Sequence, residues 1–290
     1  MISENVRGAF MMSASMAGFV LNDALMKLVG PELGLFQSIF VRGLFTIIFL
    51  GALAWFLGAF KTLPGRKDRG LIGLRAVGEI GATLFFLTAL FNMELANATA
   101  ILQILPLTMA LAAAVFLAEP IGPRRLMAIF LGLAGVLLII RPGAEGFNQY
   151  ALFALAAVVT VTFRDLLVRR FSADVSSAFV AFTASVVITI TGAIGSLLQG
   201  TWVPLGWAEF QVLIPAAFCM TVAYYFSVAA MRVGDVAVVA TYRYTILIWA
   251  MLLGYFFFDE IPDALALVGM VLIAGAGLFM LWRQTGFRKR

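Results

Sequence analysis

Apolar runs of about 20 residues recur along the whole sequence and are separated by short polar connections. A helix of about 20 residues is about 30 Å long, the thickness of the hydrocarbon layer of a bilayer. The chain is 63% hydrophobic and only 12% charged. Backbone groups in lipid must bond within their own segment, and the runs are too long for barrel strands. The sequence therefore predicts an all-α, polytopic membrane protein.

We expect ten transmembrane helices and no soluble domain. The ten runs are 6–28, 35–60, 70–92, 95–118, 124–141, 149–169, 176–198, 209–230, 236–257 and 263–283. The first run lacks a small-residue cleavage site with a mature domain behind it, so a removed signal peptide is not expected. Cys219 is the single cysteine, which excludes an internal disulfide and argues against a thiolate metal site. No cofactor or metal is expected.

The net charge of +5 reflects orientation in the membrane rather than binding to nucleic acid. With the N-terminus placed in the cytoplasm, basic residues outside the spans gather on the cytoplasmic side, which predicts that both termini are cytoplasmic. The basic residues on that side are Arg7, Lys61, Arg66, Lys67, Arg69, Arg124, Arg125, Arg169, Arg170, Arg232, Arg283, Arg288, Lys289 and Arg290. Only Lys27 and Arg141 fall on the other side. We expect a multi-pass protein of the cell inner membrane.

The two halves of the chain resemble each other. The segment `FNMELANATAILQILPLTMALAAAVFLAEP` (91–120) parallels `AAMRVGDVAVVATYRYTILIWAMLLGYFFFDEIP` (229–262). In each, a Met begins a short connection, an Asn or Asp stands where a helix would be capped, and a Glu closes the helix. These residues are Met93, Asn97 and Glu119 in the first segment and Met231, Asp235 and Glu260 in the second. We interpret residues 1–142 and 147–284 as two repeats.

Each repeat holds five spans, so the second enters the membrane upside down relative to the first. The loop after the fourth span carries Arg124 and Arg125, whereas its counterpart after the ninth carries Asp259 and Asp263. Two inverted copies of one loop are expected to become basic on the cytoplasmic side and acidic on the outer side. Inverted five-helix repeats are typical of secondary transporters, whose substrate site lies near the midplane.

The paired segments, Glu119 and Glu260 followed by proline, and the glycine-rich last spans resemble the EamA family of the drug/metabolite transporter (DMT) superfamily. The early `NDALMK` and `QSIFVRG` stretches and `ATYRYTILIWAMLLGYFFFDEIPD` resemble a bacterial subgroup of it. The resemblance implies ten spans in two repeats, with the third, fourth, eighth and ninth lining a central cavity. It also implies a small metabolite as substrate, such as an amino acid, riboflavin or an S-adenosylmethionine-like compound. We expect the protein to be a monomer or a homodimer.

Seven charged residues lie within the predicted spans and away from the residues at the span ends. Each charge costs about 2.5–3.5 kcal/mol at a helix centre, so each should face a partner or a wet cavity. They are Asp23, Arg42, Arg75, Glu79, Arg164, Asp165 and Arg243.

Several of these charges can pair. Arg75 and Glu79 are four residues apart and share a helical face, and they serve either as a gate or as substrate contacts. Asp23 pairs either with Lys27, at the same spacing, or with Arg42 on the next span, in a gating or structural role. Arg164 and Asp165 are expected to anchor the cytoplasmic end of the sixth span.

Arg243 has no carboxylate within a turn on its own helix and is flanked by Tyr242 and Tyr244. The resemblance places it in the central cavity, where its five donors would meet a substrate carboxylate, phosphate or ring carbonyl. Since the two tyrosines point about 200° apart on a helix, only one is expected to share the cavity. Pairing with Glu79 is the alternative for Arg243.

Three further polar residues are candidate substrate contacts. Gln103 lies where inverted symmetry places a counterpart of the Thr241–Arg243 segment, and Tyr224 and Tyr225 lie in the eighth span. The alternative for mid-span hydroxyls is a bond to their own helix backbone.

The sequence excludes some energy sources and reactions. It contains no GxxxxGK[ST] nucleotide loop, so ATP-driven transport by this chain is excluded and no ATPase subunit is implied. It has no histidine and no paired carboxylates in a loop, which argues against an integral-membrane enzyme. A channel would need a continuous polar stripe, whereas the polar residues gather in patches. We expect a secondary-active, alternating-access transporter.

Overall fold

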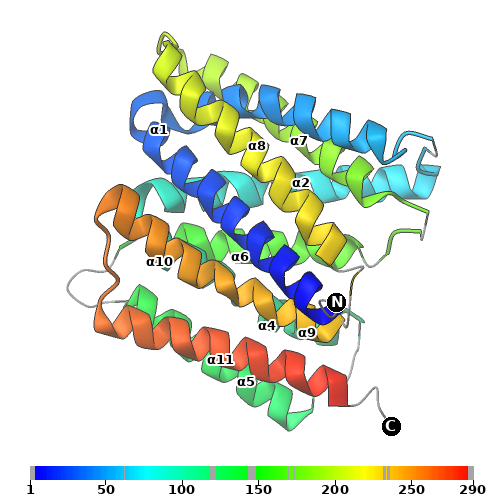
Figure 1. Ribbon diagram of the computed structural model, residues 1–290, viewed down its shortest axis with the longest axis vertical. Helices are drawn as coiled ribbons and strands as arrows, with labels where there is room; N and C mark the ends of the chain where they lie inside the picture. Colours follow the sequence, from blue (N-terminus) through cyan, green and yellow to red (C-terminus); the bar gives the residue numbers. More distant parts are fainter. Residues whose placement is uncertain are drawn as a thin grey trace.

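A computed structural model describes residues 4–61, 63–117, 122–142, 148–168, 170–172, 174–230, 233 and 236–286. Within these ranges the protein consists of helices and turns, without strands. The helices, labelled in Figure 1, are α1 (Glu4–Phe56), α2 (Arg66–Asn92), α3 (Leu95–Leu102), α4 (Leu105–Leu117), α5 (Pro123–Ile140), α6 (Ala151–Val168), α7 (Ser177–Gln199), α8 (Trp207–Ala230), α9 (Val236–Thr241), the 3₁₀ turn η1 (Tyr242–Tyr244), α10 (Thr245–Phe258) and α11 (Ala264–Gly286).

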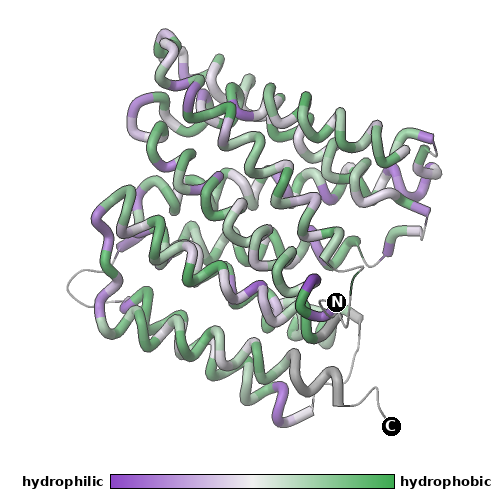
Figure 2. The backbone as a smooth tube through the Cα atoms, in the orientation of Figure 1, coloured by the Kyte–Doolittle hydropathy of each residue, from purple (hydrophilic) through white to green (hydrophobic). Residues whose placement is uncertain are grey.

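The helices form one bundle, and both chain termini lie at the same end of it (Figure 1). We call this the termini end and the opposite one the far end. Hydrophilic backbone segments are concentrated at the two ends, and hydrophobic ones dominate between them (Figure 2). The arrangement is that of a protein that crosses an apolar layer, with its polar connections on either side.

Eight of the described helices or helix pairs are long and apolar enough to cross a membrane. They include Leu95–Phe116, which joins α3 to α4, and Val238–Phe258, which runs through η1 into α10. The apolar part of α11, Ala264–Met280, is shorter. The prediction of an all-helical protein with many membrane-spanning segments is thus confirmed for the described residues.

Helix α1 comprises 53 residues but contains a non-helical residue, Gly34, with φ 72° and ψ 172°. Only glycine adopts this conformation without strain, and it reverses the chain. The two arms of α1 therefore run back alongside each other (Figure 1). The predicted boundary after residue 28 was too early, because the first arm stays helical through Pro31 up to the glycine.

Small residues allow close contacts between helices from opposite halves of the chain. Helix α1 packs against α8 and α7, α2 against α6, and α5 against α11. In the last pair, a Cβ on Gly135 would lie 2.6 Å from the Gly269 carbonyl oxygen, and one on Gly269 would lie 2.5 Å from that of Gly135. Such close backbone approach is how helices associate in lipid, where burial of apolar side chains provides no driving force.

Candidate functional site

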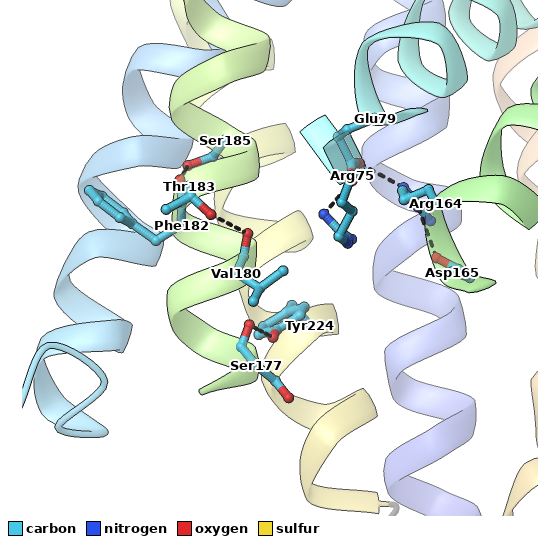
Figure 3. Close-up of polar contacts among 10 residues, drawn as sticks. All are labelled: Arg75, Glu79, Arg164, Asp165, Ser177, Val180, Phe182, Thr183, Ser185 and Tyr224. Atoms are coloured by element: carbon cyan, nitrogen blue, oxygen red, sulfur yellow. Dashed lines mark hydrogen bonds and ion pairs between the residues drawn. The ribbon is translucent and has the colours of Figure 1, made fainter. Parts of the chain in front are cut away.

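Four charged residues form a network between α2 and α6 (Figure 3). Glu79 Oε2 lies 2.9 Å from Arg75 Nη1, and Glu79 Oε1 accepts a 2.7 Å hydrogen bond from Arg164 Nη1. Arg164 Nε donates to Asp165 at 2.9 Å. The predicted Arg75–Glu79 pair is confirmed. Arg164 contacts Glu79 in addition to Asp165, with which it was expected to anchor the end of the helix. The carboxylate of Glu79, the alternative partner for Arg243, is therefore already paired with Arg164.

The four charges of the network sum to zero, but its ion pairs are unevenly distributed. One carboxylate, Glu79, serves two guanidinium groups, and the Arg75 side chain is only 14% exposed. The Nε atom of Arg75 is buried and has no hydrogen-bond partner among the described residues. A buried donor without a partner costs about 1–3 kcal/mol, so Arg75 has unused capacity to bind an acceptor.

At the far end, Lys27 connects the two halves of the chain. Its Nζ donates to Glu260 Oε1 and to the Met93 carbonyl, and it lies 4.9 Å from the centre of the Phe258 ring. Glu260 Oε2 also accepts a 2.7 Å hydrogen bond from the Leu95 amide, which caps α3. We call this group the far-end lock. The expected Asp23–Lys27 pair is wrong, since Lys27 has this stronger set of partners.

The far-end lock is surrounded by acidic residues outside the spans. Burial raises the pKa of the Glu94 carboxyl above its usual value, and repulsion from Glu260 and Asp263 adds to the shift. A hydrogen bond from Arg141 lowers the pKa of Asp263. Asn97 is not the cap of α3 as predicted, because the helix begins two residues earlier and Asn97 donates back to Glu94 at 2.7 Å. Glu119, Met231 and Asp235 lie outside the described residues.

Asp23 and Arg42 do not pair directly, because an asparagine lies between them. Arg42 Nη1 donates to Asn22 Oδ1 at 3.0 Å, and Asn22 Nδ2 donates to Asp23 Oδ1 at 2.9 Å. Arg42 is buried at 7% exposure and Asn22 at 2%. This chain of bonds joins the two arms of α1, a structural role in line with the predicted one.

Two apolar helices are interrupted along their length. The first breaks at Gln103 and Ile104, between α3 and α4, because Pro106 has no N–H for the Leu102 carbonyl. The second breaks at η1, which follows α9 after only six helical residues. Interrupted helices in a transporter leave backbone groups free to bind substrate or ions.

Arg243 occupies this second interruption and is exposed. Residues at positions i, i+4, i+7 and i+11 share one face of a helix, and the three that follow Arg243 at this spacing are buried. They form a buried stripe, which consists of Leu247, Ala250 and Gly254. The opposite stripe of α10 is apolar and exposed, as expected for a lipid-facing surface. It consists of Ile248, Leu252 and Phe256. Arg243 thus continues the buried stripe of its helix but is itself exposed, and the described residues give it no ion-pair partner.

The tyrosines fall into different environments. Tyr244 is buried at 7% exposure with no partner for its hydroxyl among the described residues, and Tyr242 is 40% exposed. The two side chains thus differ in exposure; that only one of them shares the cavity stays a prediction. Tyr224 donates its hydroxyl to the Ser177 carbonyl on α7 (Figure 3), whereas Tyr225 is exposed and contacts the ring of Phe226.

Other polar contacts were not foreseen from sequence. Thr108 and Thr162 hydroxyls lie 2.8 Å apart and join α4 to α6, and Asn22 mediates the Asp23–Arg42 contact. No local pattern distinguishes these residues from threonines and asparagines that bond their own helix. Among the described residues, no three His, Cys, Asp or Glu side chains come together in a way that would hold a metal ion.

A helical membrane bundle with two interrupted helices and buried charges facing its interior is the architecture of a membrane transporter. The EamA-like transporter family matches residues 6–141 and again residues 148–282. The chain belongs to this family.

The relatives of the chain include transporters for different metabolites. It is 25% identical to an S-adenosylmethionine uptake transporter of Rickettsia felis, over 91% of this chain and 88% of that one. It is 24% identical to the pseudopaline exporter CntI of Pseudomonas aeruginosa, over 89% and 90%. A riboflavin transporter of Rhizobium johnstonii is 27% identical over 82% and 76%. A protein of known crystal structure has the same fold, with a TM-score of 0.59 and 20% identity over 91% and 96% of the two chains.

Proposed function

We propose that this protein is a secondary-active, alternating-access transporter of a small polar or amphipathic metabolite. An amino acid, riboflavin or an S-adenosylmethionine-like compound fits this description, in line with the substrates in the names of its relatives. The observation that carries the proposal is Arg243, an exposed cation that continues the buried stripe of an interrupted helix. A fixed charge in an apolar bundle is retained where it meets water or a ligand.

We further propose that the chain crosses the membrane ten times in two inverted repeats, residues 1–142 and 147–284. Supporting this, Gly34 divides α1 into two arms, and the family matches each half of the chain separately. The helix contacts also obey the expected symmetry. The contact between the first arm of α1 and α8 corresponds to the contact between α6 and α2 in the other repeat. In the same way, the contact between α1 and α10 corresponds to the contact between α6 and α4. The two interruptions, at Gln103 and at η1, fall in equivalent helices.

The termini end is proposed to face the cytoplasm of a cell with an inner membrane. The basic residues of the connections support this orientation. Those described at the termini end are Lys61, Arg66, Lys67, Arg69, Arg124, Arg125 and Arg170. The far end instead carries mainly acidic groups around the lock. Tags on both ends of the chain that are reachable only from the cytoplasmic side would support this orientation.

The proposed transport cycle alternates the two ends between open and closed. We propose that the far-end lock closes one side and that Arg243 and Arg75 are reached from the other, in a state open toward the termini end. We propose that the chain carries out no enzymatic reaction. A channel is disfavoured because the lock interrupts any continuous polar path.

The test is transport by purified protein in vesicles, with radiolabelled S-adenosylmethionine, riboflavin and methionine as probes. A carrier gives saturable uptake that unlabelled compound on the opposite side accelerates, which a channel does not. Arg243→Ala should reduce uptake by about 10- to 100-fold, the loss expected when a charged hydrogen-bond partner is removed. Arg170→Ala, an exposed arginine at the same end, is the control and should transport normally. Normal uptake by the Arg243 variant would contradict the proposed site.

A further inference from the structure

A cavity of about 280 Å³ lies at the termini end, between α2, α7, α8, the end of α6 and the connection from α6 to α7. Its polar lining consists of Arg75, Ser172, Ser177 and Tyr224, and five apolar side chains, among them Phe171 and Val180, complete it. Figure 3 shows Arg75 extending from α2 toward the level of Val180 and Tyr224. We call this the Arg75 pocket.

Among the described residues that line the pocket, Arg75 is the only charged one. Glu79 engages its Nη1 but is shared with Arg164, and neither of these two residues lines the pocket. Guanidinium has five donors in a planar fork that matches a carboxylate, so an anionic group in the pocket would bind the donors that Glu79 leaves unused.

The opposite wall suits a cationic group close to the anionic one. Tyr224 gives its hydroxyl proton to the Ser177 carbonyl, so its oxygen presents lone pairs rather than a donor. The tyrosine ring adds a face that attracts cations. A carboxylate beside Arg75 and an ammonium beside Tyr224 are the two ends of an α-amino acid group. Such a zwitterion adds no net charge to the neutral network.

The size of the pocket limits what it accommodates. Ligand cavities span about 300–1,000 Å³, and this one is slightly smaller than that range. It fits the amino-acid part of a metabolite together with a few methylene groups against Phe171 and Val180. A flavin ring system is larger than the amino-acid part of a metabolite, and it has no carboxylate to place beside Arg75.

We propose that the Arg75 pocket binds the amino-acid end of the transported metabolite, so that the substrates are zwitterionic α-amino acids and their derivatives rather than flavins. The pocket is a site at the termini end, distinct from Arg243 in the interrupted helix. This assignment rests on the proposed transport function and names its substrate class.

The test compares binding of S-adenosylmethionine with binding of the same compound lacking its carboxyl group, by calorimetry on the full-length protein in lipid nanodiscs. The wild type should bind the carboxylated form about 10- to 100-fold more tightly, because the charged hydrogen bonds to Arg75 are lost with the carboxylate. Riboflavin should bind more weakly than S-adenosylmethionine. Equal affinity for the two S-adenosyl compounds would overturn the proposal without any variant.

Variants then assign the effect to the pocket. Arg75→Gln should abolish the preference for the carboxylated form and change the affinity for the decarboxylated form by less than about twofold. Lys67→Gln removes the same charge from an exposed position on α2 and should keep the preference. A preference that survives Arg75→Gln would overturn the assignment. If the protein shows saturable uptake but no tighter binding of the carboxylated compound, the Arg75 pocket is rejected and the transport function is kept. If it shows the tighter binding but no uptake, the transport function is rejected and the pocket is kept.

Discussion

At the residue scale, the `YRY` turn presents three consecutive side chains with three different tasks. Arg243 continues the buried stripe, Tyr242 is exposed, and Tyr244 fills the contact with α11. There a Cβ on Gly277 would stand 1.6 Å from the Tyr244 hydroxyl oxygen. Since no real contact is that short, the glycine is needed for Tyr244 to keep its place.

We predict that Gly277→Ala lowers the stability of the protein by about 1–3 kcal/mol, the usual cost of overpacking. Thermal unfolding in detergent, followed by fluorescence, measures this. The matched control is Gly275→Ala in the same helix, because a Cβ there meets nothing within 4 Å. It should change stability by no more than about 1 kcal/mol. Equal melting temperatures for the two variants would show that Tyr244 has room to move.

The sequence identified nearly every intramembrane charge that the structure uses, because a charge in an apolar run stands out from composition alone. It predicted the Arg75–Glu79 contact, which lies within one helix. It missed the Lys27–Glu260 contact, whose partners are 233 positions apart, and the role of Asn22 between Asp23 and Arg42. Pairing across helices depends on how the helices are placed, which helical spacing does not encode.

At the element scale, the two interruptions have different causes. Between α3 and α4 the cause is Pro106, visible in the sequence. At η1 there is no proline, but Thr241 and Thr245 bond the carbonyls three residues before them, at 2.7 and 2.6 Å. Such hydroxyl bonds compete with the helical ladder and tighten the turn. Neither break was predicted from the sequence. Pro106 is a visible signal for the first one, whereas no residue type marks the second.

We predict that Pro106→Ala makes the α3–α4 helix more stable and transport slower. The new N–H can bond the Leu102 carbonyl, and removing a proline from a helix interior is worth up to about 3 kcal/mol. The melting temperature should rise while the maximal uptake rate falls, because the Leu102 carbonyl that the proline leaves free becomes occupied. Pro215→Ala in α8 is the control, since that proline lies within a helix that stays continuous. A Pro106 variant that is more stable and transports normally would mean that the break has no part in the cycle.

At the scale of the whole molecule, a partly buried ion pair joins the two halves of the chain at the far end, whereas the Arg75 pocket lies at the termini end. The lock joins the first arm of α1, the start of α3 and the segment after α10, so both halves of the chain contribute to it. Because α3 and α10 are also in contact, breaking the lock should separate helices from opposite halves. That is the motion that alternating access requires of two repeats.

We predict that Lys27→Met opens the far end. It leaves Glu260 with the Leu95 amide but without its cation, and losing one partner of a buried ion pair costs about 3–5 kcal/mol. A cysteine placed at Ala250, fully buried on the stripe that Arg243 continues, reports the opening in a Cys219→Ser background that has no other thiol. Labelling by a membrane-impermeant maleimide from the far side should become at least about tenfold faster.

Glu32→Gln is the matched control, because Glu32 is exposed at the same end and outside the lock. Its labelling rate should equal that of the parent. Glu260→Gln keeps an acceptor for the Leu95 amide and removes only the ionic contact, so its labelling should fall between the parent and Lys27→Met. If Lys27→Met labels no faster than the control, the Lys27–Glu260 contact is a packing feature of a permanently closed end. Transport would then need another route past α3 and α10.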